Sequence, residues 1–407
     1  MELTVPGTVA WAAREFGDAE AVAEPGRVRL SYRELDERVT AVAGALIDAG
    51  IGRGDRVAIW APNGPEWLLT ALGTLGAGAA LVPVSTRFTG PEALDVIGRS
   101  GARALFVAGD FLGVDRLGTL LAAGPDELDR LGLVVRVPEE WDTFLQAGSL
   151  AEARRRAGAV RPGDVSDIMF TSGTTGRSKG AMTSHERSLG VARAWADCAR
   201  LGPGDRYLVV NPFFHTFGFK AGILACLVSG AALVPQAVFD AGEAMRLAEA
   251  ERITVLPGAP TIYQMILDHP ERAERDLSSL RLAVTGAADV PVALIERMRR
   301  ELSFSTVLTA YGLTEAVVAT MCRPGDPPEV VSATSGRAAA GFEVKIGRSD
   351  EILLRGPNLM LGYLNDPEAT AAAIDGDGWL HTGDLGTIDA DGYLRIVGRI
   401  KDMYICG

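Results

Sequence analysis

Short apolar runs alternate with amphipathic segments along most of the chain. First, the apolar residues Leu35, Val39, Val42 and Leu46 are spaced so that they would lie on one face of a helix. Residues 56–61, Arg-Val-Ala-Ile-Trp-Ala, then have the pattern of a strand that enters the core. The same helix-then-strand order returns at 91–108, 184–212, 219–236, 241–258, 260–288 and 291–311. Because this alternation is typical of parallel sheets covered on both faces, it predicts an α/β fold with two packed, doubly wound subdomains in residues 1–325.

The pattern changes in two places. Residues 109–160 are rich in Gly, Arg and Glu and have weak periodicity, which predicts surface helices with a loop. Residues 326–400 contain Pro-rich loops between the short strand candidates FEVKI, EILLRG and YLRIVG. This stretch predicts a small β-rich, barrel-like subdomain, and residues 401–407 follow it.

Two uncharged stretches need to be compared with a membrane span. Residues 67–84 are interrupted by Gly-Ala-Gly at 76–78, and residues 221–238 are interrupted by Ser-Gly at 229–230. Each stretch is typical of a buried helix followed by a buried strand. We therefore predict no integral membrane span.

Composition and charge narrow the class of protein. The 407 residues are 47% hydrophobic and 23% charged, which is typical of a globular chain with more than one core. The 40 Lys and Arg against 52 Asp and Glu give a net charge of -12, which argues against nucleic acid as the main partner. No CxxC spacing relates Cys198, Cys226, Cys322 and Cys406. These thiols predict neither a zinc site nor a disulfide framework and favour a cytoplasmic location.

The segment with the strongest chemical signal is 167–182, DIMFTSGTTGRSKGAM. An apolar run leads into a loop whose glycines allow close backbone approach, whose hydroxyls donate hydrogen bonds and whose Lys179 adds charge. These groups suit phosphate binding. The loop is not a Walker A motif, because Lys179 follows Ser178 and precedes Gly180. Taken alone, the segment is also compatible with a flexible surface turn.

Further motifs follow in order along the chain: NPFFHTFG at 211–218, VTGAA at 284–288, AYGLTE at 310–315, EILLRGPNLMLGY at 351–363, WLHTGD at 379–384 and GRIKD at 398–402. Together with TSGTTGRSKG at 171–180, they closely resemble the signature motifs of the acyl-adenylate-forming superfamily. This superfamily includes acyl-CoA synthetases, adenylation domains of peptide synthetases and beetle luciferases. The resemblance covers essentially the whole chain and implies its large N-terminal domain.

The resemblance implies ATP-dependent activation of a small-molecule carboxylic acid as acyl-AMP, release of pyrophosphate and transfer of the acyl group to coenzyme A. Mg²⁺ is the implied metal, with Glu315 as its ligand. The implied catalytic residues are Thr314, Glu315, His215 and Lys179. The implied ATP- and AMP-binding residues are Thr171, Ser172, Gly173, Thr174, Thr175, Gly176, Gly286, Ala287, Ala288, Ala310, Tyr311, Gly312, Asp384 and Arg399. In this assignment Tyr311 stacks on adenine, and Asp384 and Arg399 bind the ribose.

The acyl pocket is implied to include Phe213, Phe214, His215, Phe219 and Gly312. Peptide-synthetase domains place an acid after the segment that corresponds to NPFFHTFG, and residues 213–220 contain none. This favours a fatty, aromatic or alicyclic acid over an α-amino acid. The motifs look especially similar to those of actinobacterial ligases that attach CoA to the bicyclic propanoate left by steroid ring degradation.

The superfamily continues past GRIKD into a small C-terminal domain with a catalytic lysine, whereas this sequence stops at Gly407. By resemblance, Lys401 is the hinge to that domain, and we expect this chain to bind nucleotide while catalysing poorly. Two alternatives remain open, a non-catalytic adenylate-binding protein and a ligase that loads a carrier protein. The sequence also leaves open whether the chain forms an oligomer.

Overall fold

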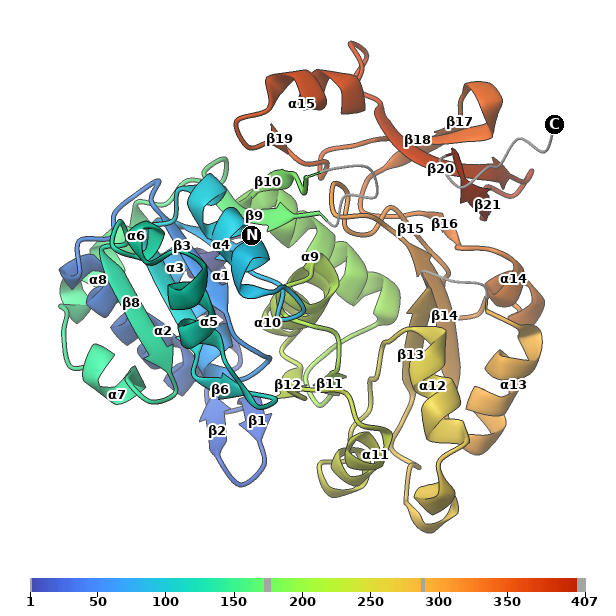
Figure 1. Cartoon of the computed structure of the whole chain (residues 1–407). Coiled ribbons are helices and arrows are strands. Elements are labelled where there is room, and N and C mark those ends of the chain that lie inside the picture. The colour runs from blue at the N-terminus through green and yellow to red at the C-terminus, as the bar shows by residue number, and fades with distance from the viewer. Residues whose placement is uncertain (1, 172–176, 287–289, 401–407) are drawn as a thin grey trace.

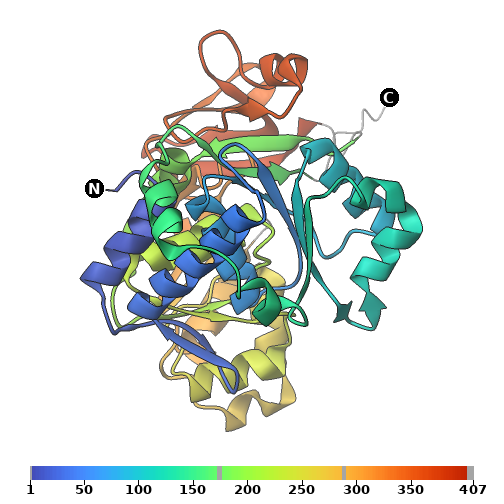
Figure 2. The ribbon, with the colours of Figure 1, turned by 90° about the vertical axis from the view of Figure 1, so that its left-hand side faces the viewer.

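The computed structural model describes residues 2–171, 177–286 and 290–400. The first half of the chain, blue to green in Figure 1, forms an α/β body beside the yellow and orange segments. The red C-terminal segment lies across the top of both. Figure 2, turned by 90°, shows the same segment above the green strands that flank the predicted phosphate loop.

The sheet nearest the N-terminus has strand order β19-β10-β9-β4-β3-β5-β8. Its strands are β3 (Arg56–Trp60), β4 (Ala80–Pro83), β5 (Ala104–Ala108), β8 (Leu133–Val137), β9 (Val165–Phe170), β10 (Gly180–Ser184) and β19 (Gly362–Tyr363). The strands from β8 to β9 pair in parallel, whereas β10 is antiparallel to both of its neighbours. β19 comes from residues 362–363, yet it joins a sheet whose other strands all come from residues 56–184.

Both faces of this sheet are buried. Along β3, Val57 and Ile59 enter a core with helices α2 (Tyr32–Asp48) and α3 (Pro65–Gly76), while Ala58 and Trp60 face a second core. The second core includes residues of the helices α4 (Gly90–Ser100) and α5 (Arg116–Ala123). A strand with both faces buried is expected in a parallel sheet covered by helices.

Local sequence signals explain why these helices form and pack. A capping box starts α2, because the Glu34 backbone N–H donates to Ser31 Oγ at 3.2 Å and the Ser31 N–H donates back to Glu34 Oε2 at 2.8 Å. Gly73 of α3 sits against Val42 of α2, where an added Cβ would lie 2.4 Å from Val42 Cγ1. The two helices therefore approach closely because residue 73 has no side chain.

A second sheet surface comprises the strand orders β11-β12-β1-β2 and β13-β14-β15-β16. Its strands are β1 (Glu20–Glu24), β2 (Val28–Ser31), β11 (Arg206–Val209), β12 (Ala232–Pro235), β13 (Leu282–Gly286), β14 (Thr306–Tyr311), β15 (Thr320–Met321) and β16 (Arg337–Ala338). Val255 forms parallel bridges to Tyr207 and to Leu282, so it joins the two groups.

The C-terminal sheet is antiparallel, with order β17-β18-β20-β21. Its strands are β17 (Glu343–Ile346), β18 (Glu351–Arg355), β20 (Leu380–Ile388) and β21 (Leu394–Arg399). The core beneath this sheet contains Ile352, Leu354 and Leu380 and also Tyr311 from the end of β14. The sheet is thus packed against the segment that carries the AYGLTE motif.

The remaining elements connect and cover these sheets. They are α1 (Val5–Glu15), β6 (Asp110–Phe111), β7 (Val114–Asp115), α6 (Pro125–Leu128), α7 (Trp141–Phe144), α8 (Leu150–Gly158), α9 (His185–Ala199), the π-helix η1 (Phe217–Leu224), α10 (Ala225–Ser229), α11 (Ala241–Ala250), α12 (Pro260–Leu267), η2 (Pro270–Glu274), α13 (Val292–Glu301), α14 (Pro328–Ala333), η3 (Arg348–Asp350) and α15 (Pro367–Ala373). Within the described ranges, no helix is both long and apolar enough to cross a membrane.

The predicted α/β fold with a small β-rich part is confirmed. The interpretation of 109–160 as surface helices with a loop was incomplete, because β8 adds a parallel strand next to β5. Its sequence, LVVRV, is fully buried only at Val135 and Val137, lies at the sheet edge and stands among Gly-, Arg- and Glu-rich segments that mask the strand pattern. The subdomain boundary at residue 325 stays a prediction.

His185 at the start of α9 is 1% exposed, and its Nδ1 accepts a hydrogen bond from the Val5 N–H at 3.3 Å. An imidazole that accepts at Nδ1 is neutral, with its proton on Nε2. Burial lowers the pKa of His185 to about 4, although Asp167 and Asp164 oppose the shift. Because an unfolded histidine titrates near 6.5, the unfolded state takes up this proton first as the pH falls.

We therefore expect the free energy of unfolding to fall by about 2 kcal/mol between pH 7 and pH 5 through His185 alone. Urea denaturation at pH 7, 6 and 5 measures this slope, and His185→Gln should flatten it. An equally steep slope in the His185→Gln variant would contradict the assignment.

Candidate active site

The predicted phosphate loop leaves the end of β9 and returns at the start of β10. The Thr171 N–H donates to the Lys179 carbonyl at 2.9 Å, and the Lys179 N–H donates to Thr171 Oγ1 at 3.4 Å. Arg99 of α4 donates to the Ser178 carbonyl at 2.6 Å, which anchors the returning end. The other predicted loop residues lie outside the described residues: Ser172, Gly173, Thr174, Thr175 and Gly176.

The predicted adenine site lies at the carboxyl ends of β13 and β14. Gly286 is paired with Ala310, and an added Cβ at Gly286 would lie 2.3 Å from the Ala310 carbonyl oxygen. An added Cβ at Gly312 would lie 1.8 Å from the Val317 carbonyl oxygen. Close backbone approach therefore requires glycine at both positions. The predicted neighbours Ala287 and Ala288 lie outside the described residues.

Three predicted nucleotide-binding residues meet between β14 and the C-terminal sheet. The Tyr311 hydroxyl donates to Asp384 Oδ2 at 2.6 Å, and Arg399 Nε donates to Asp384 Oδ1 at 2.9 Å. Asp384 and Arg399 face each other across β20 and β21. Burial and the Asp384 carboxylate raise the pKa of the Tyr311 hydroxyl, which keeps it a donor. Because each carboxylate oxygen has two lone pairs, Asp384 can still accept hydrogen bonds from ribose hydroxyls.

Thr314 and Glu315 lie in the turn that follows β14. Glu315 is fixed at both its backbone and its side chain: the Met360 N–H donates to its carbonyl at 2.7 Å, and the Tyr363 hydroxyl donates to Oε1 at 2.6 Å. The ring of Tyr363 lies 5.0 Å from Lys179 Nζ. The predicted magnesium ligand and the predicted phosphate-binding lysine are thus neighbours of the same side chain.

The Glu315 carboxylate fits a magnesium ion bound together with a nucleotide. Mg²⁺ in nucleotide sites takes hard oxygen ligands, commonly one or two carboxylates plus substrate phosphates and water. Tyr363 occupies only Oε1, and within the described residues the structure gives Oε2 no hydrogen-bond donor. The arrangement therefore leaves a carboxylate oxygen for such an ion.

His215 stands in the NPFFHTFG segment just before η1 and remains exposed. Its Nδ1 accepts a hydrogen bond from the Phe217 N–H at 3.2 Å, which places the proton of the neutral ring on Nε2. Surrounding protein and the charge of Arg87 lower the pKa of His215. The exposed ring can therefore offer its Nε2–H to a ligand.

The phenylalanines of this segment have different surroundings. Phe213 and Phe219 are 0% exposed and pack on Trp67, with ring centroids 5.3 and 6.1 Å from that of Trp67. Phe214 is half-buried. The structure thus places Phe213 and Phe219 in the core next to His215, and their contact with an acyl group stays a prediction.

Asn63, in the loop after β3, forms hydrogen bonds with the NPFFHTFG segment. It is 6% exposed, and its Oδ1 accepts a hydrogen bond from the Phe213 N–H at 2.7 Å. Its amide nitrogen donates to the carbonyls of Asn211 at 3.0 Å and Gln236 at 3.1 Å. One buried amide therefore ties three chain segments together at the carboxyl ends of the strands.

A fully buried ion pair lies between the phosphate loop's strand and the π-helix. Lys220 Nζ of η1 lies 2.9 Å from Asp167 Oδ1 of β9, and both side chains are 0% exposed. Asp167 Oδ2 accepts hydrogen bonds from the hydroxyls of Ser166 at 2.6 Å and Ser188 at 2.9 Å. Because its charge is paired with Lys220, Asp167 is not available as a partner for a substrate ammonium.

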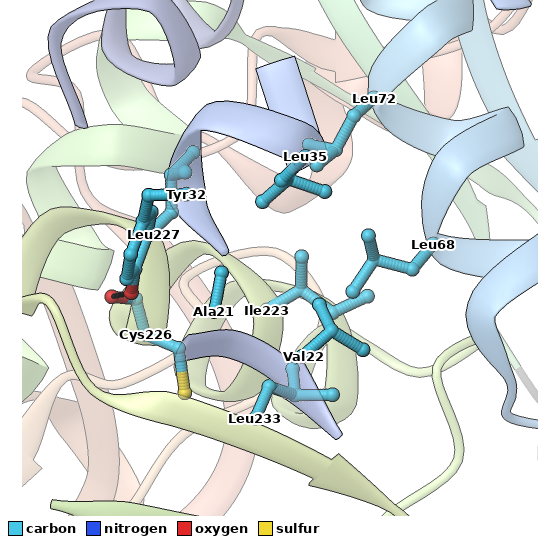
Figure 3. Close-up of a pocket in the computed structure, with 10 residues that line it drawn as sticks. All are labelled: Ala21, Val22, Tyr32, Leu35, Leu68, Leu72, Ile223, Cys226, Leu227 and Leu233. Carbon is cyan, nitrogen blue, oxygen red and sulfur yellow. Dashed lines mark hydrogen bonds between the residues drawn. The ribbon is translucent and has the colours of Figure 1, made fainter. Parts of the chain in front are cut away.

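The structure also contains a small cavity, shown in Figure 3, among side chains of β1, α2, α3, η1, α10 and β12. Tyr32, Leu35, Leu68 and Cys226 are among its lining residues. Its free volume of about 10 Å³ is close to the minimum for one water molecule and its lining is mostly apolar. It is a packing defect rather than a site for an acyl group.

Sequence reasoning did not assign roles to Tyr363, Asn63 or the Lys220–Asp167 pair. Tyr363 ends the motif EILLRGPNLMLGY, so its position in a motif was the available signal. For the pair, an isolated lysine inside the apolar run FGFKAGIL was a signal, because a buried lysine requires an acidic partner.

Comparison with known proteins agrees with this fold and site. The AMP-binding enzyme family matches residues 9–364, and the chain belongs to this family. It is an AMP-forming acid:CoA ligase, whose substrates include ATP and coenzyme A.

Two similar relatives carry the same name, 3-[(3aS,4S,7aS)-7a-methyl-1,5-dioxo-octahydro-1H-inden-4-yl]propanoyl:CoA ligase. The one from Rhodococcus jostii is 56% identical over 99% of this chain and 81% of its own length. The one from Mycobacterium tuberculosis is 55% identical over 99% of this chain and 80% of its own length. The crystal structure of the N-terminal domain of FACL13 from Mycobacterium tuberculosis has a TM-score of 0.88 at 28% identity, covering 98% of this chain and 100% of that domain.

The predicted hinge residue Lys401 lies outside the described residues.

Proposed function

We propose that this chain activates the bicyclic, steroid-derived propanoate of its two similar relatives with Mg²⁺ and ATP and transfers the acyl group to coenzyme A. The observation that carries the proposal is the identity of 56% and 55% over 99% of the chain to two ligases named for that substrate. A cytoplasmic location, expected from the scattered cysteines, is part of the proposal.

The geometry supports the first half-reaction. A carboxylate must attack the α-phosphorus of ATP, so two anions meet and charge develops on the departing pyrophosphate. In this proposal Lys179 and Thr171 bind the terminal phosphates, and Thr314 and Glu315 act beside the α-phosphate. When bound, Mg²⁺ supplies divalent charge that neutralises the phosphate oxygens. Catalysis would then consist mainly of positioning and charge neutralisation.

The nucleoside half of ATP would be held by the cluster around Asp384. The Asp384 carboxylate, oriented by Tyr311 and Arg399, would accept hydrogen bonds from the ribose hydroxyls. The ring of Tyr311 would stack on adenine, opposite the backbone at Gly286. His215 would stand where the acyl group meets the thiol of coenzyme A.

The test of substrate class is thermal stability with non-hydrolysable acyl-adenylate mimics. The panel holds a bicyclic propanoyl, a linear fatty, an aromatic and an aminoacyl mimic, with AMP as the reference ligand. A mimic that binds only the folded state adds about 2.7 kcal/mol of stability at 100 times its dissociation constant. We expect the bicyclic mimic to produce the largest shift and the aminoacyl mimic none beyond AMP, because Asp167 is already paired. A larger shift with the linear mimic than with the bicyclic one would contradict the proposed substrate.

A further inference from the structure

Tyr363 connects two predicted catalytic residues that are far apart in sequence. Its hydroxyl donates to Glu315 Oε1 at 2.6 Å, and its ring lies 5.0 Å from Lys179 Nζ. Lys179 comes directly before β10, and Glu315 comes shortly after β14. A single side chain therefore contacts both the residue assigned to the metal and the lysine assigned to the phosphates.

The backbone around Tyr363 is held firmly enough for such a role. Its strand, β19, pairs with β10, where Tyr363 is opposite Ala181. The Leu364 N–H donates to the Gly180 carbonyl at 2.8 Å, and the Tyr363 N–H donates to Thr370 Oγ1 at 2.9 Å. The tyrosine is thus attached directly to the strand that leaves the phosphate loop, so its position follows the returning end of that loop.

Charge explains why a tyrosine suits this position. A hydroxyl that donates to a carboxylate forms a charge-assisted hydrogen bond, which stabilises the anion and fixes its orientation. The Tyr363 hydroxyl donates to Glu315 Oε1 in this way. Its aromatic face is at the same time a favourable surface for the Lys179 ammonium. The same side chain thus offers complementary groups to an acid and to a base.

We infer that Tyr363 is a positioning residue that aims the free oxygen of Glu315 at the magnesium ion of bound ATP and holds Lys179 beside it. The inference rests on the proposed function, because it assigns Glu315 and Lys179 to Mg²⁺ and phosphate. It adds that Tyr363 connects these two residues, with its hydroxyl on Glu315 and its ring beside Lys179.

The test compares how strongly Mg²⁺ improves ATP binding. The measured quantity is the ratio of the ATP dissociation constants without and with Mg²⁺, obtained by calorimetry or thermal shift on the full chain. Tyr363→Phe keeps the ring but loses the hydroxyl, so we expect this ratio to fall about 10-fold, as for a lost hydrogen bond to a charged group. AMP binding, which does not need the metal, should stay within about 2-fold, which allows for experimental scatter.

A matched control is available in the same chain. The Tyr393 hydroxyl donates to Asp326 Oδ1 at 2.9 Å, away from Glu315, so Tyr393→Phe removes an equivalent bond and should leave the ratio unchanged. A second variant, Tyr363→Leu, also removes the ring and should weaken ATP binding without Mg²⁺ by about 3-fold, the effect of losing a modest cation–π contact. In a Glu315→Gln background, Tyr363→Phe should have little further effect on the ratio, because the hydroxyl acts through that carboxylate.

The outcomes separate this inference from the proposed function. An unchanged ratio in a folded Tyr363→Phe variant that binds AMP normally would overturn the positioning role while leaving the proposed function intact. Equal losses in Tyr363→Phe and Tyr393→Phe would also overturn it. Failure of the parent chain to bind either AMP or any acyl-adenylate mimic would instead contradict the proposed function.

Discussion

Lys220→Met is expected to lower the free energy of unfolding by about 3–5 kcal/mol, the range for breaking a buried ion pair by removing one partner. The methionine retains most of the apolar stem, so the loss comes mainly from the charge left on Asp167. Lys220 and Asp167 are both 0% exposed and lie 2.9 Å apart, and water cannot replace the lost ammonium without entering the core. The measurement is urea denaturation of the two proteins at pH 7.

Two variants control this experiment. Lys220→Met combined with Asp167→Asn removes both charges and should recover most of the stability, because the asparagine oxygen can still accept from Ser166 and Ser188. Arg33→Met breaks the exposed pair between Arg33 and Asp18 and should cost less than about 1 kcal/mol. Equal destabilisation in the single and double variants would show that packing rather than charge determines the effect.

The ion pair also relates the two halves of the candidate site. Asp167 lies on the strand that enters the phosphate loop, and Lys220 lies in the π-helix that follows the NPFFHTFG segment. The π-helix η1 is eight residues long and continues into α10, and π-helical turns are rare outside functional sites. A buried pair at this junction fixes how β9, which leads into the predicted phosphate loop, and the helix after His215 lie relative to each other. Its removal should therefore also alter binding of acyl-adenylate mimics more than binding of AMP.

Much of the fold follows from local sequence patterns. The amphipathic spacing around Val39 predicts α2, and the apolar run at 56–61 predicts β3. The runs FEVKI, EILLRG and YLRIVG correspond to β17, β18 and β21. These predictions succeed because each element buries a face of its own sequence. The buried face therefore appears in the sequence as apolar residues with a period of 3.6 in a helix or 2 in a strand.

Two strands could not be predicted from their own sequence, because they form by pairing with strands that are distant along the chain. β19 is two residues long and becomes a strand only because β10, from residues 180–184, lies next to it. β8 is five residues long, lies at the sheet edge and is fully buried only at Val135 and Val137. In both cases the pairing partner, rather than the segment's own periodicity, determines the structure.

The candidate site, like the fold, has features that the sequence predicts and features that depend on distant contacts. Motifs indicated Tyr311, Asp384 and Arg399 individually, and the structure brings them into one hydrogen-bonded cluster. Motifs alone could not distinguish Phe213 and Phe219, which pack on Trp67, from an aromatic that faces a ligand. That distinction depends on Trp67, about 150 residues away along the chain. Contacts of this kind need the folded backbone.

Glu315→Ala is expected to reduce the rate of acyl-adenylate formation roughly 150-fold, which corresponds to about 3 kcal/mol of transition-state stabilisation. The reason is the proposed role of the Glu315 carboxylate, which is to hold Mg²⁺ where charge develops on the phosphates; Tyr363 occupies only its Oε1. The measurement is single-turnover release of pyrophosphate with the bicyclic propanoate, at limiting and at saturating Mg²⁺. The loss should be largest at limiting Mg²⁺, because an excess of the ion partly compensates for a weakened site.

Binding measurements distinguish this loss from general damage. Glu315→Ala should retain its affinity for AMP, because in the proposed function Asp384 and Tyr311, rather than the metal, bind its ribose and adenine. Glu329→Ala, at an exposed position in α14, should leave both the rate and its dependence on Mg²⁺ unchanged. If Glu315→Ala formed adenylate at the parent rate under limiting Mg²⁺, the carboxylate would not be the metal ligand. Tyr363 would then orient a group with some other role, and the coupling between Glu315 and Lys179 would lose its chemical basis.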